Sequence, residues 1–423
     1  MINLSNFKPM DDIIRKFGAW LLMIMPLVAL LNPWEVAILY GLSIRVIDLI
    51  FLLSLNTGIL HILFYGKLRR NVLIFLVLVI FIYLITLLGL MVVPDYQVAW
   101  PPLFRFTQTI LWGGLALLFI KSKKEFKIII RNIIFAGDIL SVFSVYLYMT
   151  NKGLHRIAGF FSAAGGEGLG RQASYNEIGA IYTLAILLSL YCLFWDSGYL
   201  WKRENIKFYV GFILNLIGLI LVQSRSAIFA LFVGCIVLVF PRLKRIFIHG
   251  IITKSTIKYM NIILMTIFII IVGTTYIIRI NRLSATFIKG SSEYISAITR
   301  IALWIKSINI WLDGILNFLL GYGFRTTDRF LGVASAHNFF LNISLWLGLL
   351  GLFPILFIIV WPILKIRKNK DLETIPIASI TTSIAFIVSI FGNVLVDPFY
   401  GGTTFLLLYA AMAVSNSKKY RGY

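Results

Sequence analysis

Charged residues are scarce in this sequence. Asp, Glu, Lys and Arg together make up 13% of its 423 residues, whereas hydrophobic residues make up 60%. A soluble domain carries roughly 25% charged residues, so this composition excludes a water-soluble globule. Apolar runs of about 18 residues or more, each long enough to cross a hydrocarbon core of roughly 30 Å, recur along the chain. The sequence therefore predicts an all-α, polytopic membrane protein.

Motifs for metal, nucleotide and disulfide chemistry are missing as well. No HxxxH, CxxC or external DxD pattern occurs, and no Walker or dinucleotide-binding glycine motif. The two cysteines, Cys192 and Cys235, lie in apolar stretches, as small core residues do. These absences argue against metal-dependent chemistry and against energy from cytoplasmic ATP. We therefore expect neither a metal nor a cofactor.

Twelve apolar segments of the chain are interpreted as membrane spans. They lie near residues 17–33, 46–65, 73–93, 103–120, 128–149, 176–196, 207–222, 226–240, 259–278, 337–364, 375–394 and 402–416. No repeat of fixed period and no low-complexity tract separates them. The sequence thus predicts a single membrane domain over residues 1–423.

Acidic residues are few, with 17 Asp and Glu against 39 Lys and Arg, and the formal net charge is +22. Such an excess could indicate nucleic-acid binding, but the basic residues concentrate in alternate loops instead. They occupy the N-terminal stretch, every second loop and the C-terminal tail, as the positive-inside rule requires of cytoplasmic segments. We therefore predict a multi-pass topology with cytoplasmic N- and C-termini and no nucleic-acid partner.

The remaining loops are then external, and the longest runs over residues 279–336. A loop of this length exceeds a simple connector. Its stretch SEYISAITRIALWIKSINIW has helical periodicity with scattered charge, so we expect helices that lie on the external surface. Another external loop, near residues 150–175, is rich in glycine and contains Arg156.

External arginines oppose the positive-inside bias and therefore need an explanation. Arg225, in the stretch QSRS, has apolar residues on both flanks, and Arg300 has a similar setting. A charge inside the membrane costs at least ~2.5 kcal/mol and marks a functional candidate. Because a guanidinium suits phosphate oxygens, several such arginines fit the diphosphate of a lipid-linked substrate. The alternative for each is headgroup anchoring or a local ion pair.

His337 stands at the external end of the tenth segment. At helical spacing it shares one stripe with Ser344, Gly348 and Gly351, whose small side chains let another helix approach closely. We expect the stripe to face the bundle, where a histidine with its ordinary pKa of ~6.5 accepts a proton near neutral pH. The alternative is an interfacial histidine that hydrogen-bonds a loop. His61, within the second segment, is expected to contact a local partner.

The string His337-Asn338, nine residues, Gly348, two residues, Gly351 resembles the H-[NSQ]-x9-G-x-x-[GTY] pattern of the O-antigen ligase and O-antigen polymerase superfamily. Other landmarks follow in the family's order, namely RIAGFFSA with YNEIGAIY, QSRSA, TRIALWIKSINI and GYGF. The resemblance covers about residues 156–365. The spacing from Arg156 to Asn176 is longer than in the family pattern, and we interpret the intervening stretch GGEGLGR as an insertion.

This resemblance implies a GT-C-like membrane glycosyltransferase in a bacterial cytoplasmic (inner) membrane. Such enzymes take a glycan from undecaprenyl diphosphate on the external leaflet and transfer it to a hydroxyl, inverting the anomeric centre without a metal. By matched position, His337 would act as the general base or orient the acceptor hydroxyl. Gly348 and Gly351 would pack the helix that follows it. The residues that would bind the substrate and its diphosphate are Arg225, Arg300, Arg156 and Asn338.

Three functions are open at this point. We expect a polymerase of lipid-linked repeat units for an O-antigen, capsule or exopolysaccharide, with a second lipid-linked glycan as acceptor. Membrane lipid and other assembly proteins, such as a chain-length regulator, are its further expected partners. A ligase that transfers the glycan to lipid A–core has the same motif and mechanism. A flippase for the same lipid-linked units is the third function, but two related halves and short external loops are not seen.

Overall fold

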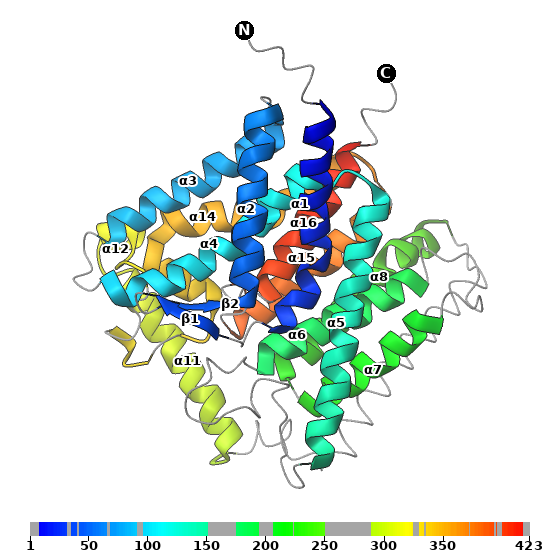
Figure 1. The fold of residues 1–423 in the computed structure, drawn as a ribbon. Helices are drawn as coiled ribbons and strands as arrows, with labels where there is room; N and C mark the ends of the chain where they lie inside the picture. The colour runs from blue at the N-terminus through cyan, green and yellow to red at the C-terminus, as the bar shows by residue number, and fades with distance from the viewer. Residues whose placement is uncertain are drawn as a thin grey trace.

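The structure, a computed structural model, describes most of the chain. The described residues are 8–31, 35–39, 42–65, 68–90, 96–150, 175–193, 206–222, 224–249, 289–324, 330–333, 336–371, 373–392, 395 and 400–417. Its elements (Figure 1) are α1 (Lys8–Val28), η2 (Ala29–Leu31), β1 (Glu35–Leu39), β2 (Leu42–Arg45), α2 (Val46–Tyr65), α3 (Arg70–Leu90), α4 (Tyr96–Phe119), α5 (Lys123–Thr150), α6 (Tyr175–Tyr191), α7 (Ile206–Val222), α8 (Arg225–His249), α11 (Ser292–Trp311), α12 (Ile315–Leu320), α14 (Phe339–Lys368), α15 (Thr374–Ile390) and α16 (Tyr400–Ser417).

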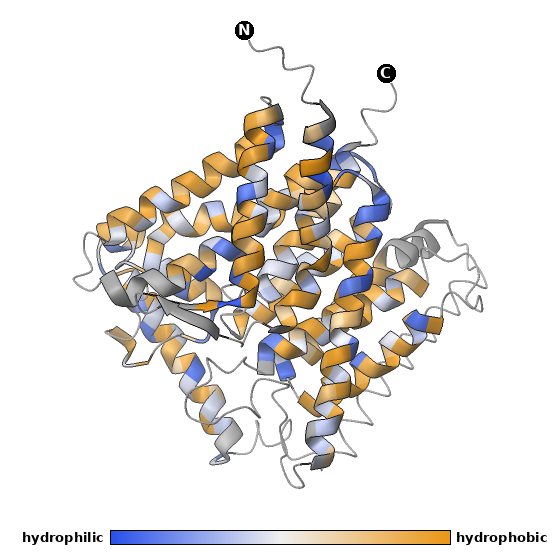
Figure 2. Cartoon of the chain, in the orientation of Figure 1, coloured by the Kyte–Doolittle hydropathy of each residue, from blue (hydrophilic) through white to orange (hydrophobic). Residues whose placement is uncertain are grey.

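The described part of the chain is almost entirely helical and largely apolar. Four helices, α2, α3, α5 and α14, are long and apolar enough to cross a membrane. On α3, exposed Leu73, Val77, Ile80 and Leu84 form a stripe at helical spacing, as on a helix face that meets lipid. Figure 2 shows hydrophobic residues, in orange, along nearly all of α3 and along much of α2. The prediction of a helical membrane protein is therefore confirmed.

Eleven of the twelve predicted segments coincide with helices, and the segment 259–278 lies outside the described residues. Boundaries differ at some ends: α1 begins at Lys8, and α8 continues to His249. Several of the coinciding helices carry apolar stretches of only 10–17 residues. Twelve membrane crossings therefore stay a prediction.

A β-hairpin before α2 departs from the predicted all-α fold. Strand β1 pairs with β2 in antiparallel register, with Leu39 opposite Leu42 and Glu35 opposite Arg45. The strands have five and four residues, too few for a period-2 pattern to stand out between apolar helices. The structure is therefore a helical bundle, as predicted, with one small hairpin in addition.

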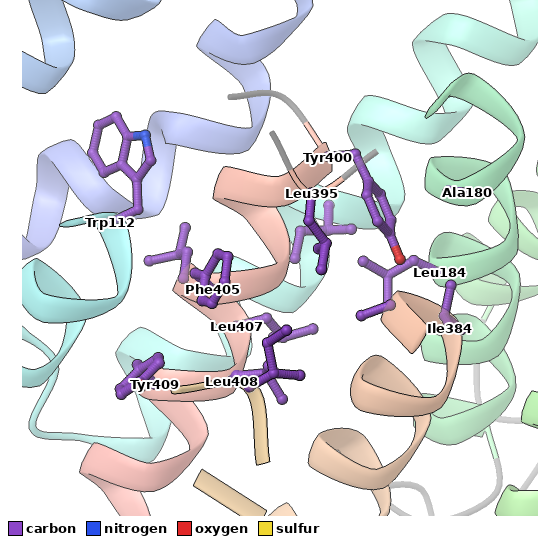
Figure 3. Packing of buried hydrophobic residues seen from close by; sticks show 14 of the residues in the cluster. Trp112, Ala180, Leu184, Ile384, Leu395, Tyr400, Phe405, Leu407, Leu408 and Tyr409 are labelled. Carbon is purple, nitrogen blue, oxygen red and sulfur yellow. The ribbon is translucent and has the colours of Figure 1, made fainter. Parts of the chain in front are cut away.

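Helix α16 forms the centre of the bundle. Every side chain from Tyr400 to Ser415 is buried, as expected for a helix that is apolar on all sides. It packs against α4, α14 and α15. Figure 3 shows Tyr409 of α16 in this core, together with Trp112 of α4, Leu184 of α6 and Ile384 of α15.

The bundle has two distinct ends. Helix α1 begins and α16 ends on the same side, the upper side in Figure 1, and α11 lies on the opposite side. Helices expected within residues 279–336 are present as α11 and α12, and both contact α14. Which end of the bundle faces the cytoplasm stays a prediction.

Helix α14 is kinked at Gly348. This residue has φ 60° and ψ −164°, a conformation that is almost exclusive to glycine. The break leaves the carbonyl groups of Leu345 and Trp346 without the partners of a regular helix. The backbone N–H groups of Tyr322 and Gly323 donate to these carbonyls instead, at 2.7 and 3.1 Å. The kink and the Gly-Tyr-Gly segment after α12 therefore stabilise each other.

The kink predicts that Gly348→Ala destabilises the protein strongly. A Cβ atom there would lie 2.3 Å from the backbone carbonyl of Leu319, and the backbone conformation would be strained too. We expect a loss of about 3 kcal/mol or more in the free energy of unfolding, measured by thermal unfolding in detergent. Gly332→Ala is the control, because φ is 73° there but nothing lies within 4 Å of its Cβ. Equal melting temperatures for the two variants would contradict this explanation.

Candidate functional site

His337 lies in the turn before α14 rather than on the helix. Its φ of 53° is in the left-handed region of backbone conformation, which residues other than glycine rarely adopt. Two hydrogen bonds hold the preceding residue, Ala336. Its carbonyl accepts from the indole N–H of Trp304 on α11 at 3.0 Å, and its N–H donates to the side-chain oxygen of Asn342 at 2.9 Å. Such strain, of the order of 1–3 kcal/mol, persists only where its surroundings fix it.

Asn338 begins α14 as its N-cap. Its side-chain oxygen accepts from the backbone N–H of Leu341 at 3.1 Å and satisfies one of the unpaired donors of the first turn. The side chain is buried. This contact explains why an asparagine suits the position, and the predicted part of Asn338 in substrate binding stays a prediction.

The predicted stripe from His337 to Gly351 is wrong in its geometry, because spacing arguments assume an unbroken helix. His337 precedes α14 and is exposed, and the helix changes direction at Gly348. The close approach expected at Gly348 does exist, with Leu319 at the end of α12. A Cβ atom added at Gly351 would clash first with the Cβ of Leu347 in the same helix. Gly351 is therefore needed for the kink within α14 and not for the approach of another helix.

The beginnings of α6 and α8 meet through the carboxamide of Asn176. Its side-chain oxygen accepts hydrogen bonds from the hydroxyl groups of Ser224 and Ser226 at 3.0 and 2.9 Å. These serines flank Arg225, the half-buried first residue of α8. The side-chain N–H of Asn176 donates to the carbonyl of Phe391 after α15, at 3.3 Å. One amide thus joins three helices beside Arg225.

Aromatic contacts connect this amide network to the turn that contains His337. The ring of Phe391 lies 6.3 Å from the ring of Trp304, the same indole that bonds to Ala336. Phe340 in the first turn of α14 stacks on Phe386 of α15, at 5.4 Å. Motifs that lie far apart in the sequence are therefore linked by one continuous set of contacts.

Arg300 makes the surroundings of His337 electropositive. It lies one helical turn before Trp304, so the two side chains project from the same face of α11. Neighbouring protein atoms desolvate the imidazole and lower the pKa of His337 below 6.5, although much of its surface is exposed. The positive charge of Arg300 lowers this pKa further. A histidine of this kind is neutral at pH 7 and able to accept a proton.

Sequence analysis missed a buried polar cluster between α2 and α4. Asp48 forms an ion pair with Arg105 and accepts hydrogen bonds from the side chain of Gln108 at 2.9 Å and the backbone N–H of Arg45 at 2.7 Å. All four residues are less than a tenth exposed. The sequence did offer a signal for this cluster, because Asp48 and Arg105 lie near the starts of the apolar segments 46–65 and 103–120. A charge in such a place is costly in a membrane unless it is paired.

This cluster borders the turn that contains His337. Phe106 follows Arg105 on α4, and its ring lies 6.5 Å from the ring of Phe339 and 6.0 Å from that of Phe324. Because Phe339 is the first residue of α14, the guanidinium of Arg105 belongs to the same end of the bundle as Arg300. The ion pair of Arg105 with Asp48 therefore lies at the same end of the bundle as the candidate site.

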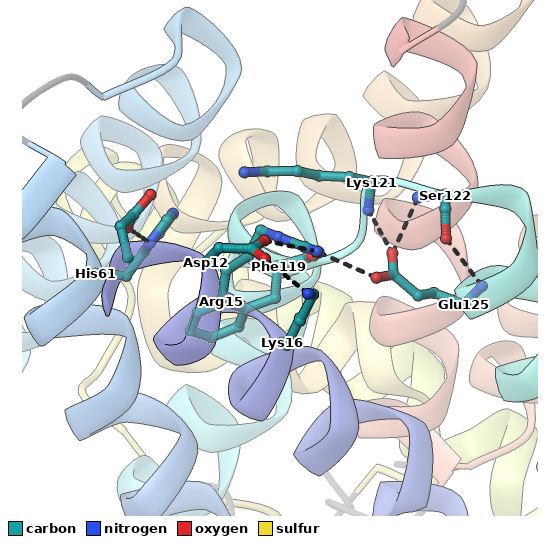
Figure 4. Close-up of polar contacts among 9 residues, drawn as sticks. Asp12, Arg15, Lys16, His61, Phe119, Lys121, Ser122 and Glu125 are labelled. Atoms are coloured by element: carbon teal, nitrogen blue, oxygen red, sulfur yellow. Dashed lines mark hydrogen bonds and ion pairs between the residues drawn. The ribbon is translucent and has the colours of Figure 1, made fainter. Parts of the chain in front are cut away.

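Other predicted residues lie elsewhere. Arg156 is outside the described residues. His61 pairs with Asp11 at 2.5 Å, which confirms the expected local partner, and Figure 4 shows it at the end of the bundle where α1 begins. Both cysteines are buried, as predicted. Within the described ranges, no group of three or more His, Cys, Asp or Glu side chains is placed to hold a metal ion. Metal independence of the chemistry stays a prediction.

Comparison with known proteins gives no assignment. No protein-family model matches the chain, and no curated protein matches it. The resemblance to the O-antigen ligase and polymerase superfamily therefore depends on the motifs, and on whether the residues that carry them act together.

The contacts predict that Trp304→Phe loosens the turn that contains His337. Phenylalanine keeps much of the ring packing but removes the indole N–H, and a neutral hydrogen bond contributes about 1 kcal/mol. We expect amide hydrogen exchange in residues 336–342 to become several-fold faster. Trp311→Phe is the matched control, because that indole on the same helix donates to Phe318 instead. Equal effects of both variants on residues 336–342 would contradict the assignment.

Proposed function

We propose that this chain is a membrane glycosyltransferase that polymerises undecaprenyl-diphosphate-linked oligosaccharide units of a surface polysaccharide. The observation that supports the proposal most is the set of contacts that links the segments of Arg225, Arg300 and His337. In the superfamily that the motifs resemble, residues at these positions serve the donor diphosphate and the acceptor hydroxyl. Members with this motif act without a metal, which suits a site built from guanidinium groups and an imidazole.

The donor side of the proposed reaction uses Arg225 and Arg300. Each guanidinium offers a planar pair of N–H donors that matches phosphate oxygens. Negative charge grows on the diphosphate as the glycosidic bond breaks, and fixed cations at a membrane boundary stabilise it strongly. The N-termini of α6 and α8 meet beside Arg225, and their dipoles favour an anion there as well.

The acceptor side uses His337. Its neutral imidazole accepts the proton of an acceptor hydroxyl as that oxygen attacks the anomeric carbon. A new carbon–oxygen bond forms on the opposite face, the bond to the diphosphate breaks, and undecaprenyl diphosphate leaves. The proton passes from the imidazole to water. Exposure of His337 in a fixed turn suits a group that must meet a large glycan.

The proposed arrangement in the membrane has twelve spans and cytoplasmic termini, with the site on the external face of a bacterial cytoplasmic membrane. Basic loops at the end where α1 begins support this orientation. Helix α11 is then a surface helix. Its exposed Ile298, Ile301, Ile305 and Ile308 lie near one face, as in helices that rest on a bilayer.

A direct assay tests the proposed function. Purified protein in liposomes receives an undecaprenyl-diphosphate oligosaccharide, in the presence of EDTA, and products are separated by chain length. We expect longer chains and released undecaprenyl diphosphate, and a loss of about a hundredfold or more in rate for His337→Ala. His61→Gln is the control, since that histidine pairs with Asp11 in the first turns of α1 and is not part of the candidate site. Transfer only to lipid A–core would indicate a ligase, and full activity of His337→Ala would refute the assigned base.

The lowered pKa of His337 predicts a pH dependence. Because the neutral imidazole is the active form, the rate should fall only as the pH drops below the lowered pKa. Arg300→Gln removes one of the two causes of that shift, so the acidic limb of the rate profile should move to higher pH. Arg225→Gln should reduce the rate without moving the limb. Identical limbs in all three proteins would contradict the coupling between Arg300 and His337.

A further inference from the structure

A pocket lies at the end of the bundle where α5 begins, far from His337. It is formed by the first turns of α5, the end of α6 and the beginnings of α7 and α15, and it is partly open to the surroundings. Tyr191 of α6 closes one side, with its hydroxyl donating to the carbonyl of Glu373 at 2.8 Å. The proposed transferase reaction makes no use of this pocket.

One wall of the pocket is basic. Lys123, Lys127 and Arg131 line it at steps of four residues along α5, so they share one helix face. Glu373 is the one carboxylate among the lining residues, and it pairs with Lys123. Three cations against one carboxylate leave two net positive charges in the lining. Figure 2 shows hydrophilic residues, in blue, at this end of α5.

The carboxylate of Glu125, close to this wall, has partners outside the pocket. Glu125, on the same first turn of α5, accepts from the guanidinium of Arg15 at 3.0 Å and from the backbone N–H groups of Lys121 and Ser122 at 2.9 Å each (Figure 4). Burial lowers the pKa of Lys121 to about 8, and the positive charges of Arg69 and Arg15 contribute to this shift. Positive charge therefore dominates this end of the bundle.

Most of the remaining pocket lining is apolar. Phe126 and Ile130 of α5, Phe208 of α7 and Ile377 of α15 are each less than a tenth exposed and border the same space. These buried side chains offer a ligand little surface, but Phe135 and Ile139 continue the basic row along α5 at steps of four residues, and both are exposed. An anionic amphiphile matches both surfaces, and basic pockets between membrane helices are typical sites for acidic lipid headgroups.

We propose that this pocket binds an acidic phospholipid. The phosphodiester contacts Lys127 and Arg131, and the acyl chains lie along the exposed side chains of Phe135 and Ile139 on α5. The lipid connects α5, α7 and α15 at the end of the bundle opposite to the candidate transferase site. Because binding is measured without glycan transfer, failure of this proposal and failure of the proposed function are distinguishable.

Native mass spectrometry of the full chain in detergent tests the proposal, with dioleoylphosphatidylglycerol as the probe. We expect this lipid to bind the wild type, and the double variant Lys127→Ala/Arg131→Ala to bind it at least about tenfold more weakly. Both side chains are exposed, so the fold should tolerate these changes. Lys124→Ala is the matched control, since Lys124 is an exposed lysine of the same helix outside the pocket lining. The charge-preserving variant Lys127→Arg/Arg131→Lys should retain binding.

Two further probes identify the ligand class. Dioleoylphosphatidylcholine has the same chains without net charge, and inorganic phosphate has charge without chains. Weak binding of both, beside strong binding of dioleoylphosphatidylglycerol, supports the proposal. Equal binding of the two lipids would overturn the proposal. Displacement of dioleoylphosphatidylglycerol by inorganic phosphate would overturn it too, as would an unchanged affinity of the double alanine variant for that lipid.

Discussion

The carboxamide of Asn176 is the contact on which the candidate site depends. Polar groups inside a membrane bundle must find partners within the protein, because lipid offers none. Asn176 meets this requirement for both serines that flank Arg225, and for the carbonyl of Phe391 at the end of α15. The amide thereby holds the beginning of α8, which includes Arg225, against the beginning of α6 and the end of α15.

Strain at two backbone positions shapes the other half of the site. Gly348 breaks α14, and the Gly-Tyr-Gly segment after α12 fills the break with its own N–H donors. His337 adopts a left-handed conformation because Trp304 and Asn342 hold the residue before it from two sides. Both positions cost conformational energy, and contacts from α11 and from the segment after α12 help to fix them. These two segments are therefore structural parts of the site.

Composition predicted the helical membrane fold, because burial in lipid demands long apolar runs, which are easily recognised. Helical spacing failed for α14, where the assumption of a straight helix placed His337 and Gly351 on one stripe. No periodic pattern reveals a residue in the left-handed conformation, or a kink that depends on a loop far away in the sequence. The pairing of Asp48 with Arg105 was also beyond spacing arguments, since the two residues belong to different helices.

The central claim is that guanidinium groups near His337 bind the diphosphate of a lipid-linked donor. An experimentally determined structure with undecaprenyl diphosphate bound measures this most directly. The claim predicts diphosphate oxygens within hydrogen-bonding distance of both Arg225 and Arg300, with the imidazole of His337 facing the same space. A diphosphate bound at another place on the protein, or in contact with neither guanidinium, would contradict it.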